Sequence, residues 1–452
     1  MKSKAVAHLA EAWIQAFPAF ADALDDAPER RAQREAALAA FAELGLPHRG
    51  LENWRSTSLA GLEKHMPGAP SGESPEESSL LATGRRVLDE ASLPGDDALR
   101  AVFVDGHFCP ALSSLSREDP AVRLIRVGAS GDSNSELPAG FGELADAKSD
   151  AFVALNAAFN PGVESLEIIQ DHAPSSPIHL AFISSGSERL CCPRLHITGR
   201  RGSRATVILD FLSDGEGSGL VNSVSEIFVE ENADLQYVVV EREGERAFHV
   251  DNFQAHQERD SRLSVHTLSL GGALLRNELG VKLAGTGAEA DLRGLYLASG
   301  NQHQDNHTRV DHAMPHTTSR EIYKGILAEQ ARGVFRGLIH VRPDAQKIDS
   351  TQSNMNLLLS DRSRIDTQPQ LEIHADDVKC SHGSTIGKLD EEALFYLRSR
   401  GLDEAGARAM LTRGFVAEIC DALPGKAFRD FATALVLEKI TACSNETDGA
   451  PA

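Results

Sequence analysis

A cysteine and a histidine two positions apart, Cys380 and His382, are the residues in this sequence best suited to metal or sulfur chemistry. In an extended strand, side chains at positions i and i+2 point to the same face, so the thiol and the imidazole would share one space. Thiolates and neutral imidazoles bind soft metals and iron–sulfur clusters. Two ligands do not complete a tetrahedral site. The pair is therefore either part of a shared site or a buried thiol beside a surface histidine.

A second group of candidate ligands lies in the segment NQHQDNHTRVDHAMPH, which holds four histidines and two aspartates. Such density can bind a metal ion, but the spacing of a zinc-binding helix requires a helical context. Pro315 and the local polarity indicate a loop and a strand instead. Two interpretations stay open, a metal-dependent enzyme site and a hydrogen-bonding ladder on a β surface. The histidines concerned are His303, His307, His312 and His316.

The remaining cysteines indicate a structural role and a reducing compartment. Cys191 and Cys192 are adjacent, so in a strand their side chains diverge, and we expect one buried and one exposed. The six cysteines are scattered without a CxxC motif, which is typical of cytoplasmic proteins. The first residues lack the apolar segment of a secretory signal, and no apolar run approaches the ~18 residues of a membrane span. We therefore expect a cytoplasmic protein.

Charge and missing motifs exclude several classes of function. The 452 residues include 66 acidic and 45 basic side chains, for a net charge of -21. So acidic a chain is not expected to bind nucleic acid, because phosphate contacts require clustered lysine and arginine. The motifs GxxxxGK[ST] and GxSxG are absent, so neither ATP hydrolysis nor serine-hydrolase chemistry is expected of this chain.

The middle of the chain reads as a series of short strands that would position these residues. Runs rich in valine, isoleucine and leucine alternate with polar residues and stop at glycine, asparagine or aspartate. Helical segments are missing between most of them, which argues against βαβ units. Most runs begin about 28–30 residues apart, which favours stacked coils over a sandwich or a barrel. They are RATVILDFL, ADLQYVVVE, SRLSVHTLSL, ADLRGLYLAS, GVFRGLIHV and QLEIHA, which begin near 204, 233, 261, 290, 333 and 370.

Helices are expected at both ends. Leu9, Trp13 and Phe17 follow Val6 at helical spacing, and an alanine-rich segment over 28–44 predicts a second helix. Asp390 and Asp403 are placed as N-caps of two C-terminal helices, and a third is predicted over 427–440. The predicted parts are an N-terminal helical segment 1–65, a linker and mixed region 66–175, a β core 176–387, a C-terminal helical part 388–443 and a disordered tail 444–452.

Three segments of the C-terminal third closely resemble the SufD chains of the SufB/SufD family, which belong to the SUF iron–sulfur cluster assembly machinery. They are DAQKIDSTQSNMNLLLS from Asp344, PQLEIHADDVKCSHGSTIG from Pro369 and LDEEALFYLRSRG from Leu389. The N-terminal LPHRGLENWRSTSL is similar to a short motif of the same family. SufB-like chains typically have glutamate where this chain has Gly383. They also often carry an N-terminal cysteine cluster, whereas this chain has no cysteine before Cys109. The resemblance is therefore to SufD rather than to SufB.

The resemblance implies a right-handed parallel β-helix core between helical ends, in a scaffold subunit without catalytic activity of its own. It implies a SufB-like paralogue and a SufC-like ATPase as partners, with an iron–sulfur cluster assembled transiently at the SufB interface. No cluster or metal is implied as stably bound by this chain alone. Cys380 and His382 match the family's interface residues, and the histidine is the better supported. Whether the isolated chain is a homodimer, and whether reduced flavin binds the complex, stays open.

The resemblance also implies that the C-terminal helices bind the SufC-like ATPase. The plainer alternative is that these helices only cap the end of the β stack. The apolar residues of those helices that we expect to contact the ATPase are Leu394, Leu397, Met410, Leu411, Phe415 and Ile419. A carbohydrate-active β-helix is a third possibility. It is disfavoured because four tyrosines and two tryptophans leave few side chains for sugar stacking.

Overall fold

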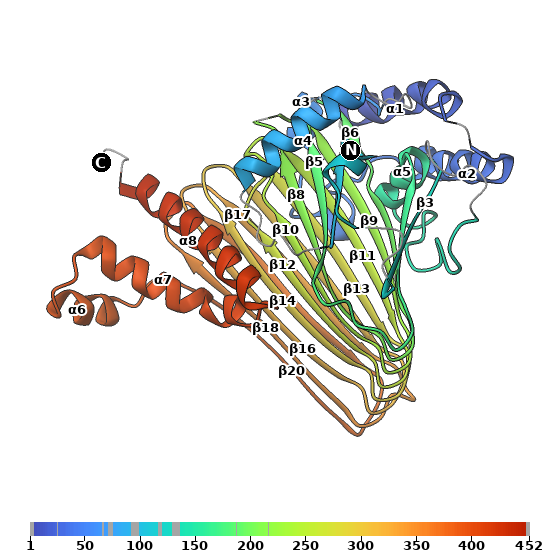
Figure 1. The fold of residues 1–452 in the computed structure, drawn as a ribbon. Coiled ribbons are helices and arrows are strands. Elements are labelled where there is room, and N and C mark those ends of the chain that lie inside the picture. Colours follow the sequence, from blue (N-terminus) through green and yellow to red (C-terminus); the bar gives the residue numbers. More distant parts are fainter. Residues whose placement is uncertain are drawn as a thin grey trace.

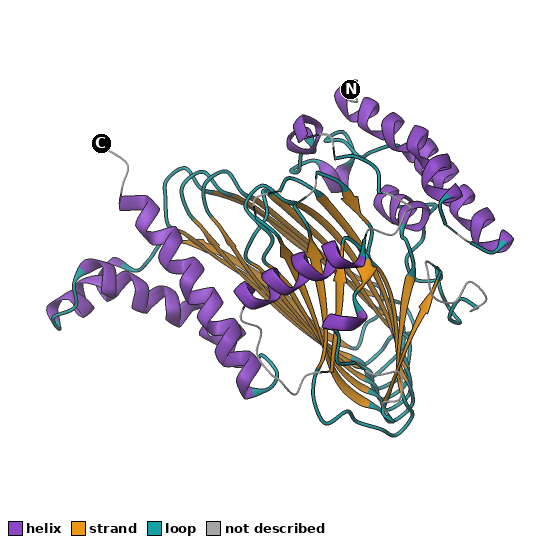
Figure 2. Cartoon of the chain, turned by 45° about the horizontal axis from the view of Figure 1, so that its top comes forward, coloured by secondary structure: helices purple, strands orange, loops and turns teal. Residues whose placement is uncertain are grey.

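The computed structural model describes residues 4–448 except 25, 66, 71–75, 92–98, 116–119, 129–135, 187 and 216. Helices flank a region made almost entirely of strands (Figure 1 and Figure 2). The helices are α1 (Lys4–Asp22), α2 (Pro28–Leu44), η1 (Glu52–Trp54), α3 (Ala60–His65), α4 (Glu77–Ala91), η2 (Pro110–Leu112), α5 (Ala151–Phe159), α6 (Glu391–Ser399), α7 (Glu404–Asp421) and α8 (Lys426–Asp448).

The strands pair into two long sheets. They are β1 (Leu99–Val104), β2 (His107–Phe108), β3 (Val122–Val127), β4 (Val163–Ile168), β5 (Ile178–Ser184), β6 (Leu190–Cys191), β7 (Arg194–Gly199), β8 (Arg204–Ser213), β9 (Leu220–Val229), β10 (Asp234–Glu241), β11 (Phe248–Gln257), β12 (Arg262–Ser269), β13 (Leu274–Leu283), β14 (Glu289–Ala298), β15 (His303–His312), β16 (Thr318–Leu327), β17 (Arg332–Val341), β18 (Ile348–Leu358), β19 (Arg364–Ile373) and β20 (Val378–Gly387).

The two sheets form a parallel β-solenoid. The first sheet has the order β2-β1-β5-β8-β10-β12-β14-β16-β18-β20, and the second has the order β19-β17-β15-β13-β11-β9-β7-β4-β3. From β7 onward, successive long strands alternate between the sheets, so each coil contributes one strand to each sheet. Neighbours pair in parallel, as when Asp234 of β10 lies between Arg204 and Arg262, except β1 with β2 and β3 with β4, which pair antiparallel. The predicted stack of parallel coils is confirmed.

One coil accounts for the spacing read from the sequence. The first four predicted strands are β8, β10, β12 and β14, which are neighbours in one sheet, whereas the last two are β17 and β19 of the other. The same corner recurs after β9, β11, β13 and β15 with a residue in the left-handed region. Glycine, asparagine and aspartate adopt that conformation most easily. These residues are Asn232, Asp260, Gly287 and His316, with φ of 59°, 55°, 75° and 60°.

The interior of the solenoid is filled by side chains stacked coil upon coil. Val207, Tyr237, Val265 and Leu292 occupy equivalent positions in β8, β10, β12 and β14, and each is at most 2% exposed. A fully buried side chain of this kind stabilises the fold by roughly 1.5–3 kcal/mol, so the interior is the main source of stability. The strands pair without helical crossovers because each coil buries its apolar face against the next.

Helices cover the outer faces of both sheets. Near the N-terminus, α1, α2 and α5 pack through Trp13, Phe41 and Phe159 onto the second sheet, against residues such as Phe248. At the other end of the chain, α7 and α8 pack on the first sheet through residues such as Ile419. Figure 1 shows these two helical groups on opposite sides of the solenoid. The C-terminal helices therefore cover the outer face of the first sheet rather than the end of the stack, where the plainer alternative placed them.

The predicted helix boundaries hold with two differences. Asp390 accepts hydrogen bonds from the backbone N–H groups of Glu392 and Ala393, and Asp403 accepts one from Gly406, so both N-caps are confirmed. The linker expected from residue 66 contains helix α4, because an amphipathic segment begins at Glu77. Helix α8 continues to Asp448, past the start of the tail predicted over 444–452. Residues 449–452 of that tail lie outside the described residues.

Candidate functional site

The solenoid ends in two strands that have a neighbour on one side only. Within the described residues, β20 closes the first sheet and pairs with β18, and β19 closes the second and pairs with β17. Isoleucine side chains of these strands are exposed, Ile373 by 39% and Ile386 by 52%. A free edge presents backbone N–H and C=O groups that can pair with another chain. This end of the solenoid is an uncovered pairing surface, and Cys380 and His382 lie on it.

The strand register fixes where Cys380 and His382 point. Cys380 lies beside Ser350 of β18, and His382 lies beside Gln352. Both neighbours are buried in the solenoid, at 0% and 2% exposure. Because Cβ atoms at paired positions point to the same face of a sheet, Cys380 and His382 lie on the interior side of the last coil. Cys380 is half-buried and His382 is exposed at the open end.

The interior columns beneath this pair change from apolar to polar before they reach it. The column that ends at His382 runs through Val265, Leu292, Glu321 and Gln352. The neighbouring column turns polar at the same coil; it runs through Leu263, Ala290, Ser319 and Ser350 and ends at Cys380. Buried polar groups are unfavourable unless they are hydrogen-bonded, so their partners identify what they do.

A hydrogen-bonded chain leads from His312 to the position under Cys380. His312 Nδ1 lies 2.7 Å from Thr317 Oγ1, and His312 Nε2 lies 2.9 Å from Ser319 Oγ. Thr317 donates its own proton to a backbone carbonyl, so it accepts from Nδ1–H, and Ser319 donates to Nε2. Ser350 Oγ, 2.6 Å from Ser319 Oγ, must then donate to it. The lone pairs of Ser350 are left to accept from the Cys380 thiol.

Two pKa shifts agree with this assignment of hydrogen-bond donors and acceptors. Burial lowers the pKa of His312 to about 4, so its ring is neutral at neutral pH. Burial raises the pKa of the Cys380 thiol, and the neighbouring Asp349 carboxylate raises it further. The protonated thiol is therefore the resting form of Cys380, and it needs a metal or a proton acceptor to become a strong ligand.

The column under His382 contains a buried carboxyl group. Glu321 accepts hydrogen bonds from Thr308 Oγ1 at 2.5 Å and from Gln352 Nε2 at 2.8 Å. Burial raises the pKa of Glu321 to about 7. Gln352 Oε1 is buried and has no hydrogen-bond partner among the described residues, which leaves an acceptor beside the strand position of His382. Polar groups thus reach two coils inward from the open end.

The four clustered histidines do not converge on one point. His303 and His307 lie on the outer face of β15, where His303 bonds Thr57 at 2.9 Å, whereas His312 lies on the interior face. His316 forms the corner after the strand. Within the residues that the structure describes, no group of three or more His, Cys, Asp or Glu side chains is arranged to hold a metal ion. The metal site considered for these histidines is not formed.

The N-terminal motif LENWRST packs against the same outer face. The Arg276 guanidinium lies 3.8 Å from the centre of the Trp54 ring and pairs with Asp305. Thr57 Oγ1 donates to Asp305 at 2.5 Å, and His307 Nε2 lies 2.9 Å from the same carboxylate. Sequence reasoning missed this connection because its partners are about 250 residues apart. It ties the N-terminal segment to a strand near the open end.

The C-terminal helices expose an apolar surface that only partly matches the prediction. Leu394 and Ile419 are buried at 5% and 0%, Leu397, Leu411 and Phe415 are half-buried, and Met410 is exposed at 56%. The most exposed apolar side chains of α6 and of the turn after it were missed; they are Phe395 at 76%, Tyr396 at 56% and Leu402 at 38%. Their signal was present in the helical period, since residues 395 and 396 follow the buried Leu394 and lie off its face. We call Phe395, Tyr396, Leu402 and Met410 the α6–α7 patch.

Two further predictions concern exposure and membranes. Cys192 is buried against the N-terminal helices, but Cys191 is only partly exposed and packs on the solenoid core. The expectation of one exposed cysteine is therefore wrong, because strand β6 is covered on both faces. Among the described helices, none is both long enough and apolar enough to span a bilayer.

Comparison with known proteins assigns the chain to a family. Residues 182–415 match the family model described as "SUF system FeS cluster assembly, SufBD core domain". The chain is 32% identical to the iron–sulfur cluster assembly protein SufD of Escherichia coli K12, over 87% of this chain and 89% of that protein. It is 29% identical to a SufBD family protein of Synechocystis (87% of each) and 30% identical to one of Mycobacterium tuberculosis H37Rv (86% and 88%).

The matched region includes the interior columns, both edge strands, α6 and the part of α7 up to Phe415, but not α8. The structural features described above, a parallel solenoid with an uncovered end bearing Cys380 and His382, lie within or beside it. The chain belongs to the SufBD family of SUF-system iron–sulfur cluster assembly proteins.

Proposed function

We propose that this chain is a non-catalytic scaffold subunit that assembles iron–sulfur clusters together with a SufB-like paralogue at the β19–β20 end. The unpaired edge of β20, with His382 on it, carries the proposal. A homologous solenoid would offer a matching edge, and edge-to-edge pairing satisfies both sets of backbone groups. The iron and sulfide of the cluster are the cargo of this site. In this proposal the work takes place in the cytoplasm.

His382 supplies a neutral nitrogen ligand, and the partner supplies thiolates. A histidine ligand usually donates its second ring N–H to an oxygen acceptor, which fixes the ring and its tautomer. Gln352 Oε1 is the acceptor available beside His382, and Glu321 holds the Gln352 amide in place. Cys380 is the weaker participant, because burial and the neighbouring Asp349 carboxylate keep its thiol protonated. Neither residue alone completes a site, so a cluster forms only while the partner is docked.

The α6–α7 patch is the docking surface for a SufC-like ATPase. Its exposed phenylalanine, tyrosine, leucine and methionine side chains are of the kinds that dominate protein interfaces. Helix α7 is joined to the solenoid through Lys324 of β16, which donates to the Phe415 carbonyl at 2.9 Å and pairs with Glu418 at 2.8 Å. Movement of the helices during the ATP cycle can therefore reach a strand two positions from β20 in its sheet. That is how ATP hydrolysis would strain or open the assembly interface.

The first experiment replaces His382 in a strain that depends on this system for its clusters. We expect His382→Ala to abolish cluster maturation while the chain still folds and co-purifies with its SufB-like and SufC-like partners. Ser381→Ala is the matched control, because Ser381 is the neighbouring residue on the opposite face of β20. Cys380→Ser should be milder. Normal maturation in the His382→Ala strain would refute the proposed role.

The second experiment separates docking from capping. The double variant Phe395→Ser with Met410→Ser should keep the thermal stability of the chain, because both side chains are exposed. It should weaken capture of the ATPase by at least tenfold, as loss of two apolar anchors does at other interfaces. Glu404→Gln at the start of α7 is the control, since it changes an exposed charge beside the patch. Unchanged capture would leave the helices with a capping role only.

A further inference from the structure

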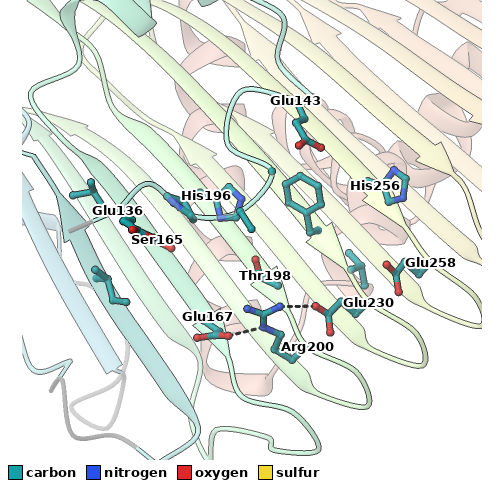
Figure 3. Close-up of a pocket in the computed structure, with 17 residues that line it drawn as sticks. Glu136, Glu143, Ser165, Glu167, His196, Thr198, Arg200, Glu230, His256 and Glu258 are labelled. Atoms are coloured by element: carbon teal, nitrogen blue, oxygen red, sulfur yellow. Dashed lines mark hydrogen bonds and ion pairs between the residues drawn. The ribbon is translucent and has the colours of Figure 1, made fainter. Parts of the chain in front are cut away.

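A cavity of about 400 Å³ lies on the outer face of the second sheet, several strands away from its end strand β19 (Figure 3). Strands β7, β9 and β11 form its floor, and the segment 136–143 lies along one side of it. None of its residues takes part in the assembly site or in the α6–α7 patch.

The segment beside the cavity is held rigidly from below. The buried carboxylate of Glu226 accepts hydrogen bonds from the backbone N–H groups of Gly142 at 2.9 Å, Leu144 at 2.9 Å and Ala145 at 3.1 Å. Arg194 donates to the same carboxylate at 2.5 Å. A carboxylate with this many donors fixes the backbone around it. The cavity is therefore preformed rather than closed by a mobile loop.

Three rings lie in a row across the floor. The centre of the Phe228 ring is 5.2 Å from that of His196 and 6.3 Å from that of His256. Phe228 is paired with Thr198 and with His256 across neighbouring strands. At Gly140, any Cβ would lie only 2.7 Å from the Phe228 ring, so glycine is needed where the covering segment crosses the floor. Aromatic faces of this kind attract cations.

The charged groups around the floor are mostly negative. Among the described residues that line the cavity, Arg200 is the one with a permanent positive charge, and it already pairs with Glu167 at 2.5 Å and Glu230 at 2.7 Å. Burial lowers the pKa values of both His196 and His256, so their rings are neutral at neutral pH. The glutamates of the lining are Glu136, Glu143, Glu167, Glu230 and Glu258.

His196 adds a second, independent sign that a ligand is missing. Its side chain is 2% exposed; the Ala139 carbonyl lies near enough to accept from one ring nitrogen, and among the described residues the other ring nitrogen has no hydrogen-bond partner. An unsatisfied buried polar group costs about 1–3 kcal/mol, so such groups usually have a partner. A neutral imidazole in the cavity wall offers a ring nitrogen to a donor inside the cavity. Carboxylates and the Thr198 hydroxyl offer further acceptors.

We propose that this cavity binds a guanidinium group, with its plane against Phe228 and its N–H groups directed to His196 and the surrounding glutamates. A guanidinium is favoured over an ammonium because it is planar, carries five donors and stacks on aromatic rings. Two sources share this chemistry, a free small guanidine and an arginine side chain on a peptide. The site is separate from the proposed assembly function and does not depend on it.

The test is isothermal titration calorimetry on the full chain with three probes. They are agmatine, a blocked Gly-Arg-Gly tripeptide and its lysine counterpart. We expect a guanidinium probe to bind at least fivefold more tightly than the lysine peptide. His196→Phe, which keeps a ring but removes both nitrogens, and Phe228→Leu should each weaken that binding at least fivefold. Tighter binding of agmatine or of the arginine peptide identifies the source.

A control variant tests whether the cationic probes bind only because the whole protein is acidic. Glu372→Gln removes an exposed carboxylate from β19, at the other end of the stack, and should leave binding unchanged. Circular dichroism of each variant establishes that it is folded. The proposal is overturned if neither guanidinium probe binds, if the lysine peptide binds equally well, or if Glu372→Gln weakens binding as much as His196→Phe does.

Discussion

Replacing Asp305 by asparagine tests whether the N-terminal segment is anchored by a buried charge. Asp305 is 1% exposed and contacts Arg276, Thr57 and His307. Arg276 is itself fully buried, and its other carboxylate partner, Glu278, is partly exposed. Asparagine keeps the shape and one carbonyl oxygen but removes the charge. The variant therefore leaves a buried guanidinium with one partner instead of two.

The expected loss in the free energy of unfolding follows from that arrangement. Breaking a buried ion pair from one side costs about 3–5 kcal/mol, because the remaining charge stays desolvated. Glu278 remains, and the amide oxygen of asparagine still accepts from Thr57, so we expect about 2–3 kcal/mol. With a urea dependence of about 1–3 kcal/mol per molar, the midpoint should fall by about 1 M.

The chain provides a specific probe for this transition. Both tryptophans, Trp13 and Trp54, lie in the N-terminal cluster, so their fluorescence reports the N-terminal part, whereas circular dichroism at 218 nm reports the strands. The fluorescence transition should move further than the circular dichroism transition. Asp366→Asn is the control, because Asp366 is 41% exposed and should change stability by about 0.5 kcal/mol or less.

The pH dependence of the free energy of unfolding tests whether the ionised form of Asp305 is the one that stabilises the fold. Although burial by itself would raise the pKa of Asp305, the Arg276 guanidinium outweighs it and holds that pKa well below its ordinary value. Its stabilisation is therefore complete above the unfolded-state value of about 3.9 and is lost as the pH falls toward the folded-state value. The difference between wild type and Asp305→Asn should be constant from pH 8 to pH 5 and shrink below pH 4. Equal midpoints at pH 7, or a difference that grows on acidification, would show that this carboxylate does not anchor the segment.

Three further predictions concern the interior and the C-terminal helices. Because the pKa of Glu321 is raised to about 7, wild type should lose stability as the pH rises from 4.5 to 7, and Glu321→Gln should reduce that slope in urea titrations; the buried Glu164 and Glu241, whose pKa values are also raised to about 7, account for the remainder. Ile419→Ala should lower the free energy of unfolding by about 2–5 kcal/mol, and Met410→Ala by less than about 0.5, because only Ile419 is buried. Gln352→Leu, which removes the acceptor beside His382, should lower cluster maturation in the dependent strain without loss of complex formation; wild-type maturation would contradict that positioning role.

The strands that could be predicted from the sequence are those in which apolar and polar residues alternate along one short run. RATVILDFL and ADLQYVVVE show that pattern, and both are strands of the first sheet. The second sheet was harder to predict. Strands such as FHVDNFQAHQ and HQDNHTRVDH bury polar side chains whose partners lie about one coil away, as in the pairing of Ser223 with Asp251. A local hydrophobic pattern cannot report a satisfied polar interior.

The candidate site was predictable in its local geometry but not in its surroundings. Cys380 and His382 lie on one face of a strand, as their spacing indicated. That this face points into the solenoid depends on the register with β18, which is a non-local property. The same limit explains the four histidines. Their density allowed either a metal site or a hydrogen-bonding ladder on a β surface, and the period of β15 sends His303 and His307 outward and His312 inward.

The polarity of the two interior columns is best understood together with the open edge above them. A solenoid that only needed stability would continue its apolar columns to the last coil, because Leu263 and Leu292 show that aliphatic side chains fit there. Instead, polar side chains occupy the last two positions before His382 and Cys380, and the Gln352 oxygen has no partner among the described residues. These side chains are Glu321, Gln352, Ser319 and Ser350. Buried polar groups are less stabilising than packed hydrocarbon, so their place in the fold requires another reason. The edge pairing orients a partner's backbone, and the polar columns hold hydrogen-bond acceptors beneath the thiol and the imidazole, so that one end of the solenoid can both dock a partner and orient ligands toward it.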